Sequence, residues 1–142
     1  MVSSRSAVMT PDGRYVTFVS EAFNLVTNDA NKIADVFLRD MQTLTTTLVS
    51  VGATSTNPAA LVPVSSSEAP EITPDGRFVA YSDRDGLYVR DVDSGDERRY
   101  ELDEGRVIFD IRWFPDGTRL LTAEQVVARS SLWVVSVLSG AR

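Results

Sequence analysis

Short runs of alternating apolar and polar residues organise this chain, and no long segment shows a helical period. One such run follows each of three Pro-Asp-Gly turns, as RYVTFVS at 14–20, RFVAYSD at 77–83 and TRLLTAE at 118–124. A period of two, with many β-branched and aromatic residues, is typical of half-buried strands. Proline, aspartate and glycine favour a tight turn between two such strands. The pattern therefore predicts an all-β protein.

The runs belong to a repeated unit. A short segment precedes each turn (SAVMT, PEIT, FDIRWF), and a later segment recurs as DVFLRD, GLYVRD and SLWVVS. The first two units add a fourth segment, TTTLVSV and ERRYEL, whereas the third unit shows none and has Ser136 in place of the aspartate. Four strands per unit is the signature of β-propeller blades. We expect a single half-propeller domain over 1–142, with blade 1 at about 4–51, an inter-blade insertion at about 52–68, blade 2 at about 69–102 and an incomplete blade 3 at about 106–142.

The number of blades predicts an assembly. A closed propeller usually has about four to eight blades, and three repeats would leave apolar faces uncovered at both ends. Two copies related by a two-fold axis would close a six-bladed ring, with the third blade of each chain on the first blade of the other. We therefore expect a homodimer. The alternative is a fragment of a longer propeller.

The repeats resemble a known family. SAVMTPDGRYVTFVS…DVFLRD and APEITPDGRFVAYSD…GLYVRDV are similar to the WD-like repeats of TolB-type propellers. The resemblance implies a binding platform for proteins, the propeller domain of a peptidase, or a metal-dependent hydrolase. It also implies a bacterial periplasmic or secreted parent protein, although the opening MVSSRSAVMTPDGR has no apolar stretch long enough for a signal peptide.

Composition narrows the chemistry. The net charge of -6 argues against a nucleic-acid partner, because phosphate binding needs a basic surface. The chain has no histidine and no cysteine, which excludes a Ser-His-Asp triad, a Cys-His dyad and imidazole or thiolate metal ligands within it. No apolar run is long enough to cross a bilayer, so we expect no membrane insertion.

Four residues before the turns are candidates to line a central channel. Counting back from the turn prolines places Glu71 and Arg112 at equivalent heights on adjacent blades, with Asp110 and Ser6 one step deeper. One interpretation is an ion pair between blades that sets their register. The other is that dimerisation duplicates Glu71 and Asp110 into a ring of four carboxylates, which would hold calcium, another hard divalent ion or a cationic ligand.

A second candidate site lies in the first unit, which carries about a dozen extra residues around EAFNLVTNDANK. Asp29, Asn31 and Asp35 have the spacing of the first oxygen ligands in a calcium loop. The glycine and the bidentate glutamate of such a loop are missing, so the alternative is that these residues only shape the connection between strands.

Two classes of function follow. The first is a non-catalytic propeller module that binds a protein or peptide, and it is favoured because Ser6 and the turn threonines have no histidine or lysine base nearby. The alternative is a metal-dependent hydrolase of an ester, lactone or phosphotriester, with a carboxylate-held cation in the channel. A peptidase propeller without its catalytic domain is a third interpretation.

Overall fold

The computed structural model describes residues 3–29, 33–51, 68–83, 86–102, 106–126 and 129–137. Within these ranges the chain forms strands joined by turns and loops, and no helix that could cross a membrane. The strands are β1 (Ser4–Met9), β2 (Tyr15–Ser20), β3 (Asp35–Asp40), β4 (Thr45–Leu48), β5 (Glu68–Ile72), β6 (Phe78–Ser82), β7 (Gly86–Asp91), β8 (Glu97–Glu101), β9 (Arg106–Trp113), β10 (Arg119–Val126) and β11 (Arg129–Ser136). The prediction of an all-β protein is confirmed.

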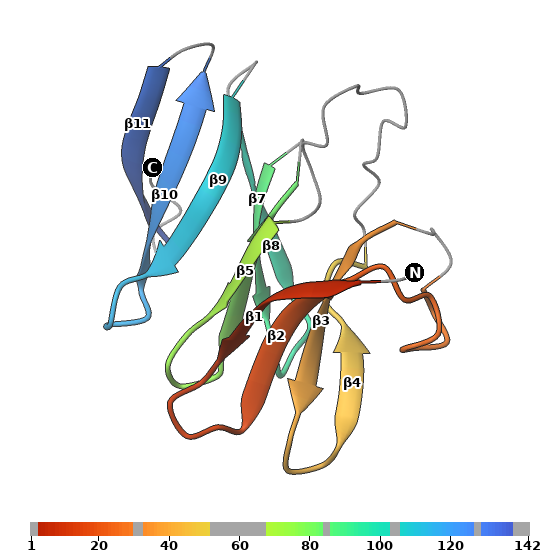
Figure 1. The fold of residues 1–142 in the computed structure, drawn as a ribbon. Coiled ribbons are helices and arrows are strands. Elements are labelled where there is room, and N and C mark those ends of the chain that lie inside the picture. The colour runs from red at the N-terminus through yellow and green to blue at the C-terminus, as the bar shows by residue number, and fades with distance from the viewer. Residues whose placement is uncertain are drawn as a thin grey trace.

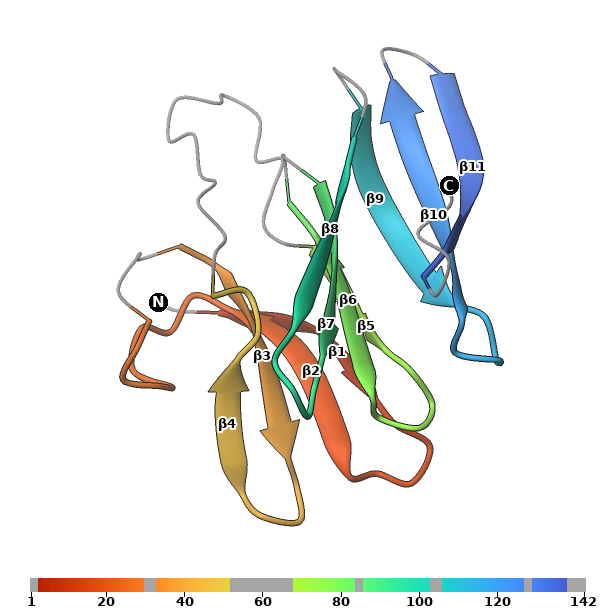
Figure 2. The same ribbon diagram turned by 180° about the vertical axis from the view of Figure 1, so that it is seen from behind.

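The strands form three separate antiparallel sheets. The first has the order β1-β2-β3-β4, the second β5-β6-β7-β8 and the third β9-β10-β11 (Figures 1 and 2). Each sheet is a meander, because every strand pairs with its neighbour in sequence. The inter-blade insertion, apart from the last of its residues, lies outside the described residues.

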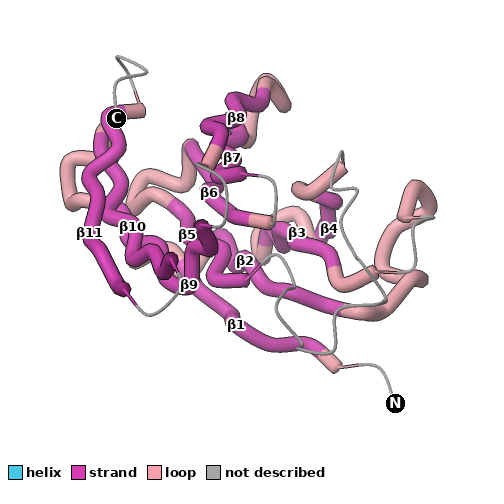
Figure 3. Tube along the Cα trace, turned by 90° about the horizontal axis from the view of Figure 1, so that it is seen from above, coloured by secondary structure: helices cyan, strands magenta, loops and turns pink. Residues whose placement is uncertain are grey.

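The three sheets radiate from a common centre. The first strands of the three sheets lie together, since β5 contacts both β1 and β9. The later strands point away from this centre, so that β4, β8 and β11 lie at the periphery (Figure 3). This is the arrangement of consecutive blades around a propeller axis.

Apolar side chains fill the two seams between the sheets. The buried residues of the first seam are Val19, Val36, Leu38, Val49, Ile72, Val79 and Tyr81. Those of the second seam are Ala80, Leu87, Val89, Ile108, Ile111, Leu120, Val135 and Val137. Because alternate residues of β6 point to opposite faces, the second sheet contributes to both seams and is covered on both sides.

The outer face of the third sheet has no such cover within the described part of the chain. Leu132 is 70% exposed and Val134 is 45% exposed. In the repeat, Leu132 matches Val36 and Leu87, which are both buried in the seams. The third sheet thus presents seam-type residues to solvent.

The opposite flank of the molecule has a similar feature. Met9, at the end of β1, is 61% exposed. It matches Ile72 and Trp113, which pack into the first and second seams. The first sheet and the third sheet therefore each expose a residue on the outer flank of the molecule at a position that packs into a seam elsewhere in the repeat.

The repeated turn is held by its own residues. In the first copy, the backbone N–H of Gly13 donates to Thr10 O at 2.9 Å, and the N–H of Tyr15 donates to Thr10 Oγ1 at 3.0 Å. Thr10 Oγ1 also donates to Asp12 Oδ1 at 2.6 Å. Gly13 has φ of 73°, in the left-handed region that favours glycine. The turn aspartate therefore has a structural role here.

Candidate functional site

Three of the four predicted channel residues come together on the inner strands. Arg112 Nη1, from β9, lies 2.5 Å from Glu71 Oε1, on β5, and 3.1 Å from Asp110 Oδ1. One guanidinium thus joins two carboxylates from two sheets. Trp113 adds a second link, because its Nε1–H donates to Glu71 O at 3.3 Å. We call Glu71, Asp110 and Arg112 the inner-strand cluster.

Irregular strand pairing positions this cluster. Register shifts fall between Arg5 and Val8 in β1 and between Glu68 and Glu71 in β5, and β9 has the same irregularity next to Asp110. A β-bulge adds one residue to a strand and redirects the side chains beside it. All three bulges lie a few residues before the turn proline, so the repeat itself builds this feature.

The inner-strand cluster is partly open to solvent. The side chain of Arg112 is 57% exposed, whereas that of Glu71 is mostly buried. Burial raises the pKa of the Glu71 carboxyl; the charge of Arg112 and its hydrogen bond oppose that rise, and the negative charge of Asp110 adds to it. A ligand at this site would meet one exposed guanidinium over two carboxylates. A cation would need to displace Arg112 from both.

Ser6, the fourth predicted residue, lies in the bulge of β1 with φ of 55°. It is exposed, and among the described residues no hydrogen bond joins its side chain to the inner-strand cluster. A non-glycine residue in this region of φ is uncommon and strained. The structure therefore joins Glu71, Asp110 and Arg112 by ion pairs in which Ser6 takes no part.

The predicted calcium ligands are only partly described. Asn31 lies outside the described residues. Asp35 is buried at the start of β3, where its Oδ1 accepts a hydrogen bond from Ser50 Oγ at 2.5 Å, and Ser50 Oγ in turn accepts from the N–H of Val36 at 2.9 Å. Asp29 is half-buried in the preceding loop. Within the described ranges, no three acidic residues lie close enough together to hold a metal ion.

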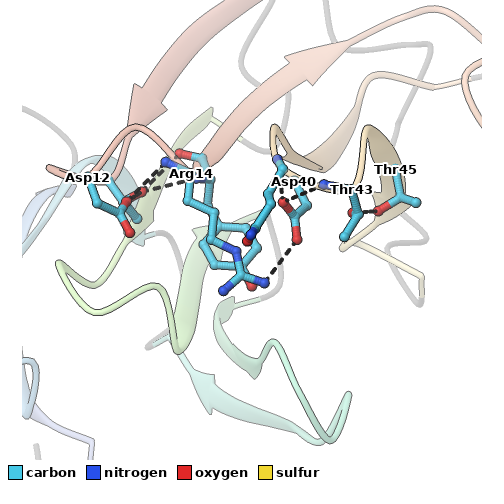
Figure 4. Close-up of polar contacts among 8 residues, drawn as sticks. Asp12, Arg14, Asp40, Thr43 and Thr45 are labelled. Atoms are coloured by element: carbon cyan, nitrogen blue, oxygen red, sulfur yellow. Dashed lines mark hydrogen bonds and ion pairs between the residues drawn. The ribbon is translucent and has the colours of Figure 1, made fainter.

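A contact between two turns that recurs in this chain was not predicted from the sequence. Asp40 Oδ2 accepts a hydrogen bond from Arg14 Nη2 at 3.2 Å, and Asp40 Oδ1 accepts from the backbone N–H of Gln42 and Thr43 at 2.8 and 3.2 Å (Figure 4). Arg14 belongs to the β1–β2 turn, and Asp40 begins the β3–β4 turn. We call this arginine–aspartate pair a turn clamp.

The second sheet repeats the turn clamp. Arg77 Nε lies 3.5 Å from Asp91 Oδ2, and Asp91 Oδ1 accepts from the N–H groups of Asp93 and Ser94, each at 3.0 Å. These backbone hydrogen bonds, with that of Ser94 the strongest, hold the pKa of Asp91 below its ordinary value. The first two sheets thus tie their turns together in the same way.

The third sheet has no turn clamp, because Thr118 and Ser136 stand at the two matching positions. Arg119 instead pairs with Asp116 of its own turn at 2.8 Å. The simultaneous loss of arginine and aspartate from one repeat is the signal in the sequence that these residues are partners.

Two clefts lie between the sheets beside the turn clamps. The first, of about 230 Å³, opens between the first and second sheets and is lined by residues that include Tyr15, Asp40 and Arg90. The second, of about 210 Å³, opens between the second and third sheets, with Phe78 and Asp91 at the positions that Tyr15 and Asp40 occupy in the first. Each cleft requires two adjacent sheets, so it belongs to the repeat.

No protein-family model matches the chain, and no curated protein matches it in sequence. Solved structures do match its fold. TolB from Acinetobacter baumannii is 19% identical with a TM-score of 0.66, over 97% of this chain and 31% of its own. Acylaminoacyl peptidase from Pyrococcus horikoshii is 14% identical with a TM-score of 0.67, over 99% of this chain and 24% of its own.

A third match has a different activity. Oligogalacturonate lyase from Vibrio parahaemolyticus is 17% identical with a TM-score of 0.62, over 93% of this chain and 36% of its own. The chain therefore spans about a quarter to a third of the length of these three proteins. At such identities the likeness concerns the fold and not the activity. The chain has the all-β architecture of TolB and other β-propeller proteins, with three antiparallel sheets arranged as consecutive blades.

Proposed function

We propose that this protein is a non-catalytic β-propeller binding module of TolB-like type, and that two copies close a six-bladed ring. The observation that carries the proposal is the exposure of Leu132 and Val134 at positions that are buried in both internal seams. Exposed apolar surface of this kind marks an interaction site. A second copy provides a matching flank, since its first sheet presents Met9 where the seams hold Ile72 and Trp113.

The expected interface follows the internal seams. The third sheet of one chain would pack on the first sheet of the other, so that Leu132 and Val134 would meet the flank where Met9 is exposed. Sheets that pack face to face bury such residues in a core about 10 Å thick. The two-fold axis would lie along the centre of the ring and repeat the interface twice.

The mass in solution tests the ring. Light scattering should give twice the 15.6 kDa of one chain. Leu132→Asp should yield single chains, because it places a charge in the apolar interface. Phe23→Asp is the matched control, since Phe23 is similarly exposed but lies in the loop after β2, and it should stay dimeric. A single-chain mass for the unaltered protein, together with a cooperative melt, would reject the ring.

The ring would give the module a polar binding face. It would bring two copies of the inner-strand cluster around one axis, with Arg112 of each chain exposed. Guanidinium and carboxylate groups in this arrangement suit the polar and charged groups of a protein or peptide. The net charge of -6 supports a partner other than nucleic acid.

A metal-dependent hydrolase is the second candidate. The closeness of Glu71 and Asp110 favours it, because both contact one guanidinium, and a structural match is an oligogalacturonate lyase in complex with manganese. A divalent cation such as calcium would compete with Arg112 for the two carboxylates, or bind the loop that carries Asp29 and Asp35.

Chelation separates the two candidates. A binding module should keep its melting temperature after dialysis against a chelator and show no metal-dependent hydrolysis of esters, lactones or phosphotriesters. Titration calorimetry with calcium and with manganese gives a direct measure of binding. A metal-dependent activity that Asp110→Asn abolishes would establish the hydrolase instead.

A periplasmic or secreted location is part of the proposal and is supported by the resemblance to TolB. Fractionation of cells that express the full-length gene product tests this location. Recovery of the protein in the cytoplasmic fraction alone would contradict it.

A further inference from the structure

The two clefts beside the turn clamps are built from matching positions but differ in the side chains that line them. Thr47 of the first sheet and Arg98 of the second sheet occupy the same position of the repeat, each paired with the third strand of its sheet in the same register. Thr47 lines the first cleft and Arg98 lines the second. The same wall therefore carries a short hydroxyl side chain in one cleft and a long guanidinium in the other.

Arg98 makes a hydrogen bond across the second cleft. Its Nη1 donates to Val137 O, just after β11, at 2.9 Å, and the hydroxyl of Tyr100 donates to the same carbonyl at 3.3 Å. Val137 is buried, and a buried backbone carbonyl without a partner costs free energy. The chain thus supplies its own arginine to this carbonyl in the second cleft.

The first cleft has the matching carbonyl but not the arginine. Val92 lines this cleft and holds the position of Val137 in the repeat. The N–H groups of both residues donate to a carbonyl at the same place in the first hairpin turn of their own sheet, at 2.8 and 2.9 Å. Among the described residues, no group donates a hydrogen bond to Val92 O. Thr47 and Val49, at the positions of the arginine and the tyrosine, have shorter side chains.

The charges around the first cleft leave one carboxylate without a counter-ion. Asp40 is paired with Arg14 in the turn clamp, at 3.2 Å. Arg90 lines the cleft, and its Nη1 lies 3.8 Å from Glu97 Oε2. Asp93 also lines the cleft, is exposed and forms no ion pair with another described residue. Two acidic–basic pairs and one unpaired carboxylate leave a local excess of negative charge, which favours a cationic ligand.

The first cleft is enclosed by two complete sheets. Its walls come from the first and second sheets, which both have four strands. The outermost strand of the first sheet, β4, contributes Thr45 and Thr47. The opening of this cleft therefore does not depend on a strand that is lacking from either wall. Its volume of about 230 Å³ is several times the share of one water molecule in the liquid, about 30 Å³, so a long side chain can enter.

We propose that the first cleft binds an arginine side chain of a partner protein. The guanidinium would donate to Val92 O, in the way that Arg98 bonds across the second cleft, and would pair with Asp93. A guanidinium suits this combination, because its planar set of N–H donors can serve a carbonyl and a carboxylate together. The net charge of -6 adds attraction for a basic segment. This inference rests on the proposed function as a binding module and names the chemistry of its partner.

A capped amino acid provides the test. Nα-acetyl-arginine amide is titrated into the isotope-labelled protein, and the backbone amides of Thr47, Val92 and Asp93 are followed by nuclear magnetic resonance. These amide signals should shift and reach saturation. Nα-acetyl-citrulline amide, which has nearly the shape of the arginine probe but no charge, should bind at least about threefold more weakly, because the ion pair is lost. Free arginine should bind no better than the capped form, since the cleft is expected to take a side chain.

Three variants keep the result specific. Asp93→Asn should weaken binding of the arginine probe at least about threefold, because the pairing carboxylate is removed. Asp96→Asn is the matched control, since Asp96 is an exposed carboxylate that lines the second cleft, and it should bind like the unaltered protein. Thr47→Arg should abolish binding, because the new side chain takes the place that Arg98 has in the second cleft. A melting temperature no lower than that of the unaltered protein would show that each variant folds.

Three results would overturn the inference. The first is that the arginine probe shifts only amides elsewhere, or none at all. The second is equal binding of the arginine and citrulline probes, or undiminished binding by Asp93→Asn. The third is much tighter binding of free arginine, which would assign the cleft to a free amino acid. These measurements need neither the ring nor a partner protein, so failure of the proposed module, which mass and chelation test, remains distinguishable.

Discussion

The second and third sheets follow one repeat but differ in what covers them. Both sheets have leucine at the same position of the repeat. The exposed fraction of its side chain is 1% for Leu87 in the second sheet and 70% for Leu132 in the third sheet. Leu87 faces the third sheet, whereas Leu132 faces no described sheet. The comparison shows that the repeat places apolar side chains where a neighbouring sheet would cover them. Burial depends on whether the neighbour is present.

The two sheets also differ in how their turns are held. Arg77 and Asp91 connect two turns of the second sheet, while Arg119 and Asp116 of the third sheet belong to one turn. The second sheet therefore has a connection across its strands that the third sheet replaces by a local contact. Within the described residues, the third sheet thus lacks an arginine–aspartate contact between its two turns.

The largest expected effect comes from Leu87→Ala, which removes a buried side chain from the second seam. It should lower the free energy of unfolding by about 2–5 kcal/mol, because a cavity remains in a packed core. Leu132→Ala should cost about 0.5 kcal/mol or less in dilute protein, since exposed substitutions have small effects. Urea unfolding measures both. Equal losses at low protein concentration would contradict the difference in burial.

Raising the protein concentration sharpens this first prediction. If a second copy covers the third sheet, the cost of Leu132→Ala should grow with concentration, because the apolar contact then contributes to the dimer. Leu87→Ala serves as the control, and its cost should not change. A concentration-independent cost for Leu132→Ala would count against the ring.

The turn glycines are expected to give the next largest effect. Gly76 has φ of 76°, and an added Cβ would lie 2.6 Å from Cδ2 of Tyr15 in the first sheet. Gly76→Ala should cost about 2–4 kcal/mol, from left-handed strain together with overpacking. Gly117 has φ of 65° but meets only Thr73, at 3.7 Å, so Gly117→Ala should cost about 1–2 kcal/mol. Thermal melts would show whether the order is reversed.

A smaller effect is expected from breaking the turn clamp. Asp91→Asn keeps an oxygen for the N–H groups of Asp93 and Ser94 but removes the charge that pairs with Arg77. The urea midpoint should fall by less than for Gly117→Ala, because exposed ion pairs contribute little. A double-mutant cycle with Arg77→Met isolates the pair.

The third sheet offers the reverse experiment. Thr118→Arg combined with Ser136→Asp should introduce a turn clamp, and the pair should be more stable than the sum of its single substitutions. Additivity of the two changes would show that the geometry of the third sheet cannot form the contact.

The smallest effects are expected from individual turn carboxylates on acidification. Hydrogen bonds from the backbone and side chain of Thr118 and from Arg119 lower the pKa of Asp116 to about 2, with the backbone bond of Thr118 the strongest cause. A carboxylate with a depressed folded pKa stabilises the protein above its unfolded pKa of about 4, and this stability is lost as pH falls toward 2. Asp116→Asn should therefore flatten part of the decline in urea midpoint between pH 4 and about 2. An unchanged profile would contradict the assignment.

Local features of the fold could be predicted from sequence because they depend on neighbouring residues. The alternation in RYVTFVS and RFVAYSD and the Pro-Asp-Gly turns correspond to β2, β6 and the hairpins before them. The resemblance to TolB-type blades, carried by the same residues, agrees with the solved structures that match. Strand alternation and turn chemistry act over a few residues, so a single sequence displays them.

The candidate site was harder to predict, because its residues are distant in sequence. Counting back from the turns placed Glu71 and Arg112 at one height, and the structure brings them within 2.5 Å. The partnership of Arg14 with Asp40 was not foreseen, although both residues recur. Ser6 was grouped with these residues by counting, and its place in a central channel stays a prediction.

The sequence by itself determined that this protein is made of strands, where the hairpins turn and that one unit is repeated, since periodicity and turn preference are local properties. The tertiary structure decided which side chains become buried, which carboxylates share an arginine and which edge stays open. These outcomes depend on the distance between sheets and on the presence of a neighbour. A leucine at the same place in the repeat is core in the second sheet and surface in the third for that reason.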